Sequence, residues 1–480
     1  MRILMLNPPF IPKYSRSSRS PAVTKGGTIY YPLWLAYATG VLEEAGHEVK
    51  LIDAPAEPLS EGQVLEIAKE FSPQLCVLDT STASIHNDVK ILERIKKEIP
   101  CFGVLVGPHV SALPAETMKM SNAIDAVCVQ EYDYTLRELA EELEKKKANL
   151  LKIRGIVYRN KKKVISNKLR EKIRNLDELP FVSSVYKKHL DYKKYFYSAN
   201  RWPEITIVTG RGCPFSCKFC NWTQNLQTGP YRKRSIRNVI EELKFIQENF
   251  KGVKEIFLED DTFTADPARA EEFCRAKIAA KINIPWSCNA RADVKKETLK
   301  LMKKAGCRLL CVGFESGSQG VLNEIRKGTT PNGMMEFVGN AKKAGILVHG
   351  CFMIGNPLDN AETIAATIEL AKKLNPDTAQ FFPIMVYPGT ATYDYFRQKG
   401  YLTTEDFSKW VDEKGWHNCI VSMPGLSNRE MIAWCDEARK KFYLRPGYVA
   451  GKFFQVIKNP AEFPRVLKAS RAFFKYLAKK

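Results

Sequence analysis

The sequence lacks any long apolar run. No stretch of about 18 apolar residues occurs, so we expect no membrane-spanning helix. The apolar stretch within residues 1–9 is too short for a signal peptide, and two prolines, Pro8 and Pro9, follow it closely. The 13 cysteines are spread over 480 residues, which is not the pattern of a small disulfide framework. Together these absences predict a cytoplasmic protein in a reducing compartment.

Acidic residues are also in short supply. The chain has 53 Asp and Glu against 74 Lys and Arg, a net charge of +21. Such an excess indicates an anionic partner, which could be nucleic acid, anionic lipid or an acidic substrate. The excess is concentrated at the C-terminus, where residues 441–480 contain a single acid, Glu462, among many basic residues.

Three cysteines are closely spaced in the middle of the chain. Cys213, Cys217 and Cys220 form a C-x3-C-x2-C pattern directly after a strand-like run, Ile205–Thr209. Three thiolates at this spacing can hold three corners of a cubane iron–sulfur cluster and leave the fourth iron without a protein ligand. An open metal position is typical of catalytic rather than structural sites.

Two other interpretations of these cysteines are a zinc site and a group of core thiols. Structural zinc usually takes four ligands, and the nearest further candidates, His189 and Cys274, lie far away in the sequence. Core cysteines would not normally be flanked by Gly212 and Pro214. We therefore favour the cluster.

The cysteine segment resembles the signature of the radical S-adenosylmethionine (radical SAM) superfamily, including an aromatic residue, Phe219, before the last cysteine. The resemblance implies a [4Fe-4S] cluster whose open iron is chelated by the amino and carboxylate groups of S-adenosylmethionine. It further implies that an electron from the cluster splits the sulfonium group and releases a 5′-deoxyadenosyl radical.

The first 150 residues alternate short apolar runs with helical patterns near 33–46, 62–70, 85–98 and 134–147. This alternation predicts a doubly wound parallel sheet in an α/β domain. Ligands of such sheets bind beyond the carboxyl ends of the strands. The expected strands are Arg2–Leu6, Val49–Ile52, Leu75–Leu78, Gly103–Val106 and Ala126–Val129.

Small and polar residues follow these strands, and the set resembles the cobalamin-binding domain found in front of many radical SAM enzymes. The resemblance implies that loops at this edge hold the corrin. The pattern Asp-x-His-x-x-Gly of related methyl-transfer domains is absent, so we expect no histidine below the cobalt. The alternative is a flavodoxin-like sheet that binds another cofactor or merely packs. The candidate residues are Asn7, Thr80, Ser81, Thr82, Gly107, Pro108, His109 and Glu131.

Residues 151–200 have the character of a connector, with a basic hairpin over 155–165 and a break at 177–180. A second βα series occupies residues 201–395. Its six βα units fit a partial (β/α)6 TIM-like barrel, the fold that the radical SAM resemblance implies. The expected strands are 204–209, 255–259, 285–289, 309–314, 347–354 and 378–383.

Residues for binding S-adenosylmethionine stand at the ends of these strands, where barrel active sites lie. Glu259 and Asp260 offer acids for an ammonium group. Asn289 and Arg291 offer an amide and a guanidinium for a carboxylate. Glu315 offers an acid beside a glycine-rich turn. Any one acid could instead cap a helix or carry surface charge.

The radical SAM resemblance implies matching roles for these positions. The acidic stretch takes the amino group, Arg291 and Glu315 take the carboxylate and ribose, and Phe219 borders the adenine. No catalytic residue beyond these binding positions can be named from the sequence.

The C-terminal region, residues 396–480, is basic, and we expect it to be helical. Phe463, Val466, Leu467, Phe473, Phe474 and Leu477 recur at helical spacing, and a shorter apolar set is Val449, Phe453, Phe454 and Ile457. Two interpretations stay open: helices that cap the barrel, or surface helices on anionic lipid. No RNA-binding pattern is visible, and we expect no nucleic-acid partner.

The combined resemblance implies a cobalamin-dependent radical SAM enzyme that functionalises an unactivated carbon, foremost by methyl transfer. The alternative is radical oxidation, cyclisation or ring contraction without methylation. The expected cofactors are a [4Fe-4S] cluster, S-adenosylmethionine and cobalamin. The expected partners are a small-molecule or lipid-like substrate, an electron donor such as flavodoxin or ferredoxin, and a membrane surface in peripheral contact with the C-terminal helices.

Overall fold

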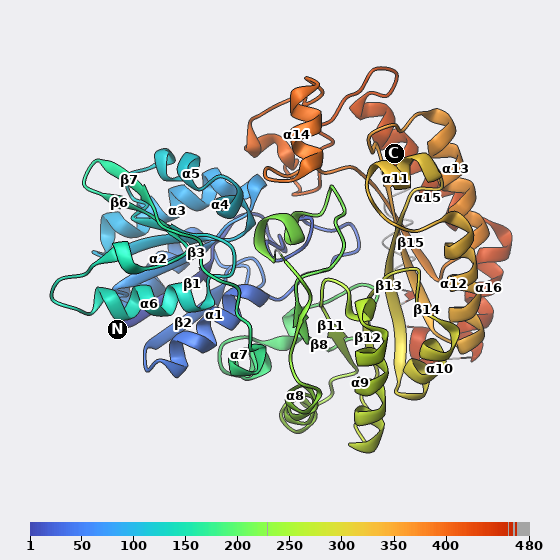
Figure 1. Cartoon of the computed structure of the whole chain (residues 1–480), viewed down its shortest axis with the longest axis horizontal. Helices are drawn as coiled ribbons and strands as arrows, with labels where there is room; N and C mark the ends of the chain where they lie inside the picture. Colours follow the sequence, from blue (N-terminus) through green and yellow to red (C-terminus); the bar gives the residue numbers. More distant parts are fainter. Residues whose placement is uncertain (228, 459, 464–465, 468–480) are drawn as a thin grey trace.

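Two helix-covered sheets lie beside one another in the computed structural model, and C-terminal helices pack at the outer edge of the second sheet (Figure 1). The structure describes residues 1–227, 229–458, 460–463 and 466–467. Most of the apolar tail pattern expected after residue 463 therefore lies outside the described residues.

The first sheet has the strand order β2-β1-β3-β4-β5-β6-β7, and its first five strands are parallel. Alternate residues of β1 face two separate cores, with Ile3 and Met5 in one and Leu4 and Leu6 in the other. Helices cover both faces, so the predicted doubly wound sheet is confirmed. The parallel strands are β1 Arg2–Asn7, β2 Glu48–Asp53, β3 Leu75–Asp79, β4 Phe102–Val106 and β5 Ala126–Cys128. The helices are α1 Leu33–Glu44, α2 Glu61–Phe71, α3 Ile85–Glu98, α4 Pro108–Ala112, α5 Pro114–Met120 and α6 Asp133–Leu143.

The hairpin expected in the connector extends this sheet. Strands β6 (Ile156–Asn160) and β7 (Lys163–Ser166) pair antiparallel, and β6 also pairs antiparallel with β5. The short β5 would otherwise leave an unpaired edge, and the hairpin supplies hydrogen-bond partners for it. The true connector between the sheets is therefore the segment after residue 166, which carries helix α7 (Val182–His189).

The second sheet has six parallel strands in the order β15-β14-β13-β12-β11-β8. The two edge strands, β15 and β8, do not pair with each other, so the barrel is open, as predicted. The strands are β8 Glu204–Ile207, β11 Glu255–Leu258, β12 Trp286–Ala290, β13 Cys307–Glu315, β14 Leu347–Ile354 and β15 Thr378–Pro383. The helices are α8 Ile236–Asn249, α9 Pro267–Ala279, α10 Lys296–Lys304, α11 Gln319–Glu324, α12 Pro331–Ala344 and α13 Ala361–Leu374.

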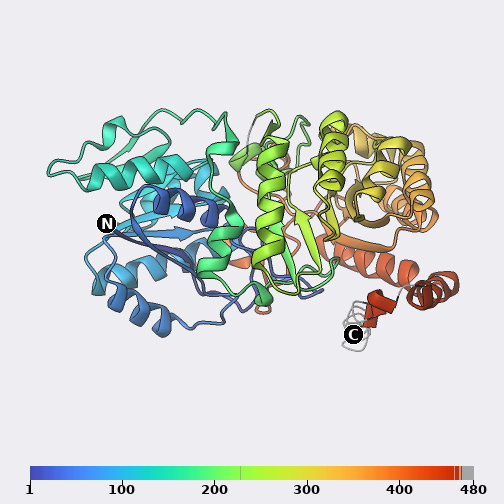
Figure 2. The same ribbon diagram turned by 90° about the horizontal axis from the view of Figure 1, so that it is seen from below.

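The C-terminal region contains α14 (Ala391–Gln398), α15 (Asn428–Tyr443) and α16 (Pro446–Lys458). Helix α15 packs on β15 and α13, and the Tyr443 hydroxyl donates to the Ala379 carbonyl at 2.6 Å. Helix α16 lies on the outside of the molecule, away from the first sheet (Figure 2). None of the described helices has both the length and the apolar character needed to cross a membrane.

Glu462 closes the lower end of the barrel. Its side chain is buried and pairs with Arg201 at 3.0 Å and Arg308 at 3.5 Å, below the amino ends of the strands. Arg308 is itself held by Glu255 at 2.7 Å. The single acid of residues 441–480 therefore attaches this part of the chain to the barrel.

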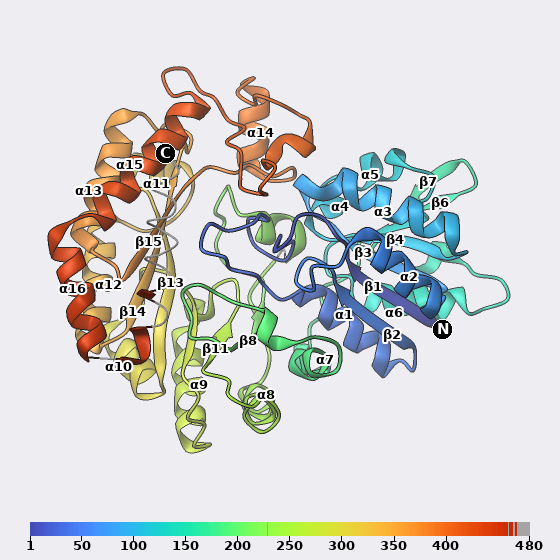
Figure 3. The same cartoon turned by 180° about the vertical axis from the view of Figure 1, so that it is seen from behind.

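A long segment, residues 8–32, connects β1 to α1, and we call it the strap. It leaves its own sheet and passes between the two sheets, where Figure 3 shows it in dark blue. Its far end pairs with the connector through the bridge of Ile29 with Phe196. The strap thus contacts both sheets and the segment between them.

Candidate functional site

The three cysteines lie on one loop at the carboxyl end of β8. The loop is closed at its base by a short ladder between β9 (Gly210–Arg211) and β10 (Arg232–Lys233). Gly212 has a φ of +87°, and a Cβ there would lie 2.4 Å from the Pro230 carbonyl oxygen. Only glycine fits at this turn, so the turn before the cysteines requires the residue that the sequence supplies.

Cys213, Cys217 and Cys220 are all half-buried free thiols. Among the described residues, no three Cys, His, Asp or Glu side chains converge on a point that would hold a metal ion. The donor set itself fits an iron–sulfur cluster, because it consists of thiols alone on one loop beside a barrel mouth. Burial raises the pKa of Cys220 to about 11, so ligation would replace a proton by iron.

Aromatic residues of the same loop contact cations of the barrel. The Arg291 guanidinium lies 3.7 Å from the Phe215 ring centroid, and the Lys327 ammonium lies 5.9 Å from the Phe219 ring centroid. These contacts hold the cysteine loop over the ends of β12 and β13. Phe219 therefore lies beside the barrel mouth.

The acids after β11 have different partners. The Asp260 carboxylate accepts hydrogen bonds from the Thr209 amide at 2.6 Å and the Tyr231 hydroxyl at 2.7 Å. The Asp260 carboxylate is therefore already hydrogen-bonded to the barrel wall. The backbone carbonyl of Asp260 is the acceptor that faces the barrel mouth. Glu259 pairs with Arg19 of the strap, and Asp261 lies 3.8 Å from the same guanidinium. Burial raises the pKa of Asp261 to about 6, and Arg19 opposes that shift.

The remaining predicted residues of the mouth are brought together. The Asn289 amide donates to the Asp260 carbonyl at 3.1 Å. Arg291 donates to the Lys327 carbonyl at 2.5 Å, and the Lys327 ammonium donates to Glu315 at 2.8 Å. Lys327 was missed by the sequence analysis, since no local pattern links it to a residue of β13.

Glu315 has a φ of +66°, an unusual conformation for a residue with a side chain. Such strain costs about 1–3 kcal/mol and is concentrated at functional sites. The conformation follows an irregularity in the pairing of β13 with β14 between Gly313 and Glu315. The strand end is therefore bent so that Glu315 and Lys327 meet at the barrel mouth.

The loops after β3 and β4 lie against each other at the carboxyl edge of the first sheet. Gly107 has a φ of +115°, and a Cβ there would lie 2.5 Å from the Thr80 carbonyl oxygen. The Thr80 hydroxyl donates to the Val106 carbonyl at 2.7 Å. Pro108 opens α4 directly after this contact. The residues of both loops are small or polar and buried, and a loop edge of this composition, without bulky apolar side chains, fits a corrin.

His109 lies in the same edge, with its Nδ1 atom 3.3 Å from the Thr82 hydroxyl. Burial lowers the pKa of His109 to about 3, so the ring is neutral. Its ring also contacts Phe407, with centroids 5.0 Å apart. Phe407 comes from the C-terminal region, and no pattern in the sequence indicates that this region reaches the first sheet.

Two further predicted residues have side-chain partners outside the Thr80 to His109 loops. Asn7 donates to the Asp53 carboxylate at 2.7 Å and accepts from Arg16 at 2.7 Å. Glu131 forms a bidentate contact with Arg232 of the cysteine-loop ladder. Asn7 therefore belongs to the hydrogen-bond network of Arg16, and Glu131 connects the first sheet to the second.

The strap brings the two strand edges close together. Tyr14 contacts the Ser81 hydroxyl at 2.8 Å, and Arg19 contacts Glu259. The Cα atoms of Tyr14 and Arg19 are five residues apart and can be separated by at most roughly 18 Å, so the strap limits how far apart the two edges can lie. Ser81 therefore serves as an anchor of the strap, and groups bound at the two edges would face each other.

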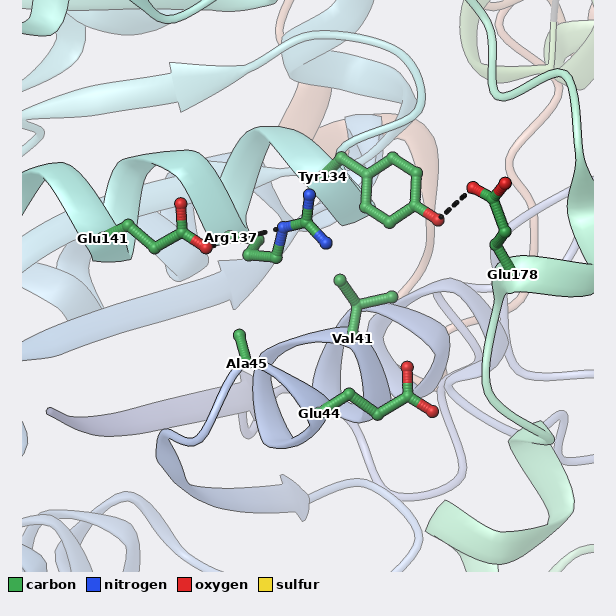
Figure 4. A pocket seen from close by; sticks show the side chains of 7 residues that line it. All are labelled: Val41, Glu44, Ala45, Tyr134, Arg137, Glu141 and Glu178. Carbon is green, nitrogen blue, oxygen red and sulfur yellow. Dashed lines mark hydrogen bonds and ion pairs between the residues drawn. The ribbon is translucent and has the colours of Figure 1, made fainter.

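A separate surface hollow lies between α1 and α6 (Figure 4). Tyr134 and Glu178 meet across it at 3.5 Å, and Arg137 lies 3.6 Å from Glu141. None of the predicted site residues lines it. We assign it no part in the site.

Two family models match the chain. The radical SAM superfamily matches residues 207–371, and the B12 binding domain matches residues 19–140. An uncharacterized methyltransferase of Pyrococcus horikoshii is 33% identical over 460 residues, which cover 95% of each chain. The anaerobic magnesium-protoporphyrin IX monomethyl ester cyclase of Cereibacter sphaeroides is 25% identical over 424 residues, 86% of this chain and 67% of that one.

The fold is also similar to a solved structure. The radical S-adenosylmethionine methyltransferase TsrM from Kitasatospora setae, with tryptophan substrate and a SAM analog bound, has a TM-score of 0.68 at 17% identity. The match covers 91% of this chain and 89% of that chain. The cysteine loop and the loops after β3 and β4 lie within the two matched family regions. The chain thus belongs to the radical SAM superfamily, in the branch with a B12-binding domain, and is a methyltransferase-like enzyme that uses cobalamin, S-adenosylmethionine and a [4Fe-4S] cluster.

Proposed function

We propose that this enzyme transfers a methyl group to an unactivated carbon of a small-molecule or lipid-like substrate. The observation that carries the proposal is the short strap between the two strand edges, anchored at Ser81 on one side and, through Arg19 and Ser20, at Glu259 and Tyr387 on the other. Methyl transfer needs the carbon radical and the methyl donor in one closed space, where positioning supplies much of the catalysis.

In this proposal Cys213, Cys217 and Cys220 hold the cluster at three irons. When bound, the cluster and S-adenosylmethionine supply the radical that removes hydrogen from the substrate. The Glu259 carboxylate and the carbonyls of Glu259 and Asp260 accept the ammonium group of S-adenosylmethionine. This assigns Asp260 a backbone role, because its carboxylate is already hydrogen-bonded to the barrel wall.

The other end of S-adenosylmethionine has its own set of residues. Arg291 and Lys327 provide the positive charge for its carboxylate, and Glu315 and Asn289 provide polar groups for the ribose. Phe219 borders the adenine. The two cations are held by buried carbonyl and carboxylate contacts, so they are positioned before the ligand arrives.

For cobalamin, we propose that the loops Thr80–Thr82 and Gly107–His109 hold the corrin without a histidine ligand to cobalt. The support is that His109 is buried, neutral and in contact with Thr82 and Phe407. Asn7 and Glu131 act as supports of this edge. Their side chains are used in internal contacts, which suits a structural role.

The test of methyl transfer uses enzyme reconstituted without oxygen, with cobalamin, a reductant and S-adenosylmethionine carrying a labelled methyl group. Incubation with a cell extract should place label in one product class and release 5′-deoxyadenosine. The same protein with all three cysteines changed to Ala should do neither. Label transfer without 5′-deoxyadenosine would contradict the radical route.

A second function, oxidation or cyclisation without methylation, is favoured by the similarity to the cyclase over 86% of the chain. The same incubation distinguishes it. Release of 5′-deoxyadenosine with no label in any product, and with a product lighter by hydrogen atoms than its substrate, would favour this alternative.

Reductive cleavage of S-adenosylmethionine consumes an electron, and we infer that a flavodoxin or ferredoxin supplies it. We also infer a cytoplasmic location, supported by the fact that all 13 cysteines are free thiols.

We further propose that α16 contacts an anionic lipid surface. Val449, Phe453, Phe454 and Ile457 are each more than half exposed, at 57%, 65%, 60% and 59%. Such a cluster is too large to be scattered surface apolar residues. The net excess of basic residues in 441–480 complements anionic headgroups. Because Glu462 also attaches this region to the barrel, capping and lipid contact are compatible.

A further inference from the structure

Arg19 occupies the acceptors that the proposed function assigns to the ammonium group of S-adenosylmethionine. Its guanidinium donates to the Glu259 carboxylate, to the Glu259 carbonyl at 3.3 Å and to the Asp260 carbonyl at 3.0 Å. A second acid, Asp261, lies 3.8 Å away. The strap therefore places a protein cation in the acidic end of the barrel mouth.

The number of acceptors matters here. An alkylammonium group has three N–H donors, and the three oxygens that Arg19 uses would satisfy all of them. If both cations were present, they would compete for the same oxygens and repel each other at short range. The two occupants are therefore mutually exclusive.

The side chain is also able to leave. Arg19 is 32% exposed, whereas Glu259 and Asp261 are only 5% and 4% exposed. Its guanidinium stacks on Trp222 with the Cζ atom 4.4 Å from the ring centroid, at the edge of the cysteine loop. The acids are fixed in the barrel, and the cation is on a flexible side chain that reaches solvent.

The neighbouring anchors of the strap are of a different kind. Arg16, three residues earlier, is fully buried and pairs with the equally buried Asp88 at 2.6 Å. Ser20 contacts the Tyr387 hydroxyl at 3.0 Å and His417 at 2.9 Å. The backbone is thus held on both sides of Arg19, so release of this one side chain does not require the strap to unfold.

We propose that Arg19 is the resident counter-ion of the S-adenosylmethionine site, and that the ammonium group of S-adenosylmethionine displaces it on binding. The proposal rests on the function proposed above. Arg19 keeps the buried acids paired before the ligand arrives, and it makes binding an exchange of one cation for another. It is a positioning residue and takes no part in the chemistry.

The test is equilibrium dialysis of labelled S-adenosylmethionine against cluster-loaded protein. Reductant is left out so that S-adenosylmethionine is not cleaved. Removing the competing cation by Arg19→Gln should tighten binding by up to about fivefold, the value of a partly exposed ion pair. Arg19→Lys should bind like the unchanged protein. Lys25→Gln removes another strap cation, one that lies over Trp416, and should have no effect.

Unchanged or weaker binding in Arg19→Gln would overturn the proposal. That result is expected if Arg19 stays on Glu259 permanently, or if Arg19 binds the carboxylate of S-adenosylmethionine. Glu259→Gln separates this failure from failure of the site assignment. If Glu259→Gln binds S-adenosylmethionine as tightly as the unchanged protein, the ammonium group binds elsewhere. The assignment of Glu259 under the proposed function is then wrong, whatever Arg19 does.

Discussion

Lys327 donates a hydrogen bond of 2.8 Å to Glu315, and both side chains are nearly inaccessible to solvent, at 10% and 6% exposure. The contact joins the end of β13 to the loop after α11. Breaking a buried ion pair by removing one partner is strongly destabilising, because it leaves the other charge uncompensated.

We therefore expect Lys327→Met to lower the free energy of unfolding by roughly 3 kcal/mol. Thermal unfolding of the cofactor-free protein is the measurement. Arg326→Met, which removes the exposed cation next in the chain, should change it little. The double variant Lys327→Met with Glu315→Gln should recover part of the loss, and failure to recover would show that the two residues are not coupled.

The cluster prediction concerns the three cysteines of the loop. Protein reconstituted without oxygen should bind about four irons per chain. Changing Cys213, Cys217 and Cys220 to Ala should abolish the bound iron and the cluster absorbance. Cys435→Ala, which removes a buried thiol of α15, should keep both. Iron retained by the triple variant would rule out this ligand set.

The cobalamin prediction concerns His109. The cob(II)alamin EPR spectrum should show no nitrogen hyperfine splitting from a protein histidine, because the ring is buried against Thr82 and Phe407. His109→Ala should leave the spectrum unchanged. Splitting that is present in the unchanged protein and lost in the variant would identify His109 as a cobalt ligand.

Anionic vesicles should bind the protein through α16 and release it with salt, because each basic residue near the surface contributes about 1 kcal/mol and is screened. Replacing Phe453 and Phe454 by Glu should end co-sedimentation. Leu151→Glu alters an equally exposed apolar residue, at 64%, on the other half of the molecule. This control variant should still co-sediment with the vesicles. Equal binding by both variants would refute the lipid surface.

A pH dependence follows from Glu204, buried in β8. Burial raises its pKa to about 8. Between roughly pH 4.5 and 8 the folded protein keeps a proton that the unfolded chain has released, so stability falls as pH rises, by about 1.4 kcal/mol per pH unit for this group. Glu204→Gln should flatten that slope, measured by thermal unfolding from pH 5 to 9. The surface variant Glu248→Gln should keep it.

The strands and the cysteine loop could be predicted because their signals are local. Apolar runs at regular spacing placed both sheets, and three thiols within eight positions defined the cluster loop. The hairpin at 156–166 was also local, but its pairing with β5 was not, because an edge strand of three residues gives no sequence signal for the partner that will cover it.

The contacts that complete the site could not be predicted, because they join distant parts of the chain. Arg19 and Glu259 are 240 residues apart, and Phe407 meets His109 from the C-terminal region. The two acids after β11 looked equivalent in the sequence. Only the positions of Thr209 and Tyr231 reveal that the Asp260 carboxylate is already occupied.

Arg16 is attached to Asp88 of α3, a helix that covers the first sheet, and Arg19 is attached to Glu259, which follows β11 of the second sheet. The two residues between them, Ser17 and Ser18, work as a spacer of fixed length. One residue inserted there would allow the sheets to separate by about 3.5 Å, and one deleted would strain them together. As long as Arg19 stays paired with Glu259, the covalent backbone itself therefore limits the width of the gap between the two strand edges.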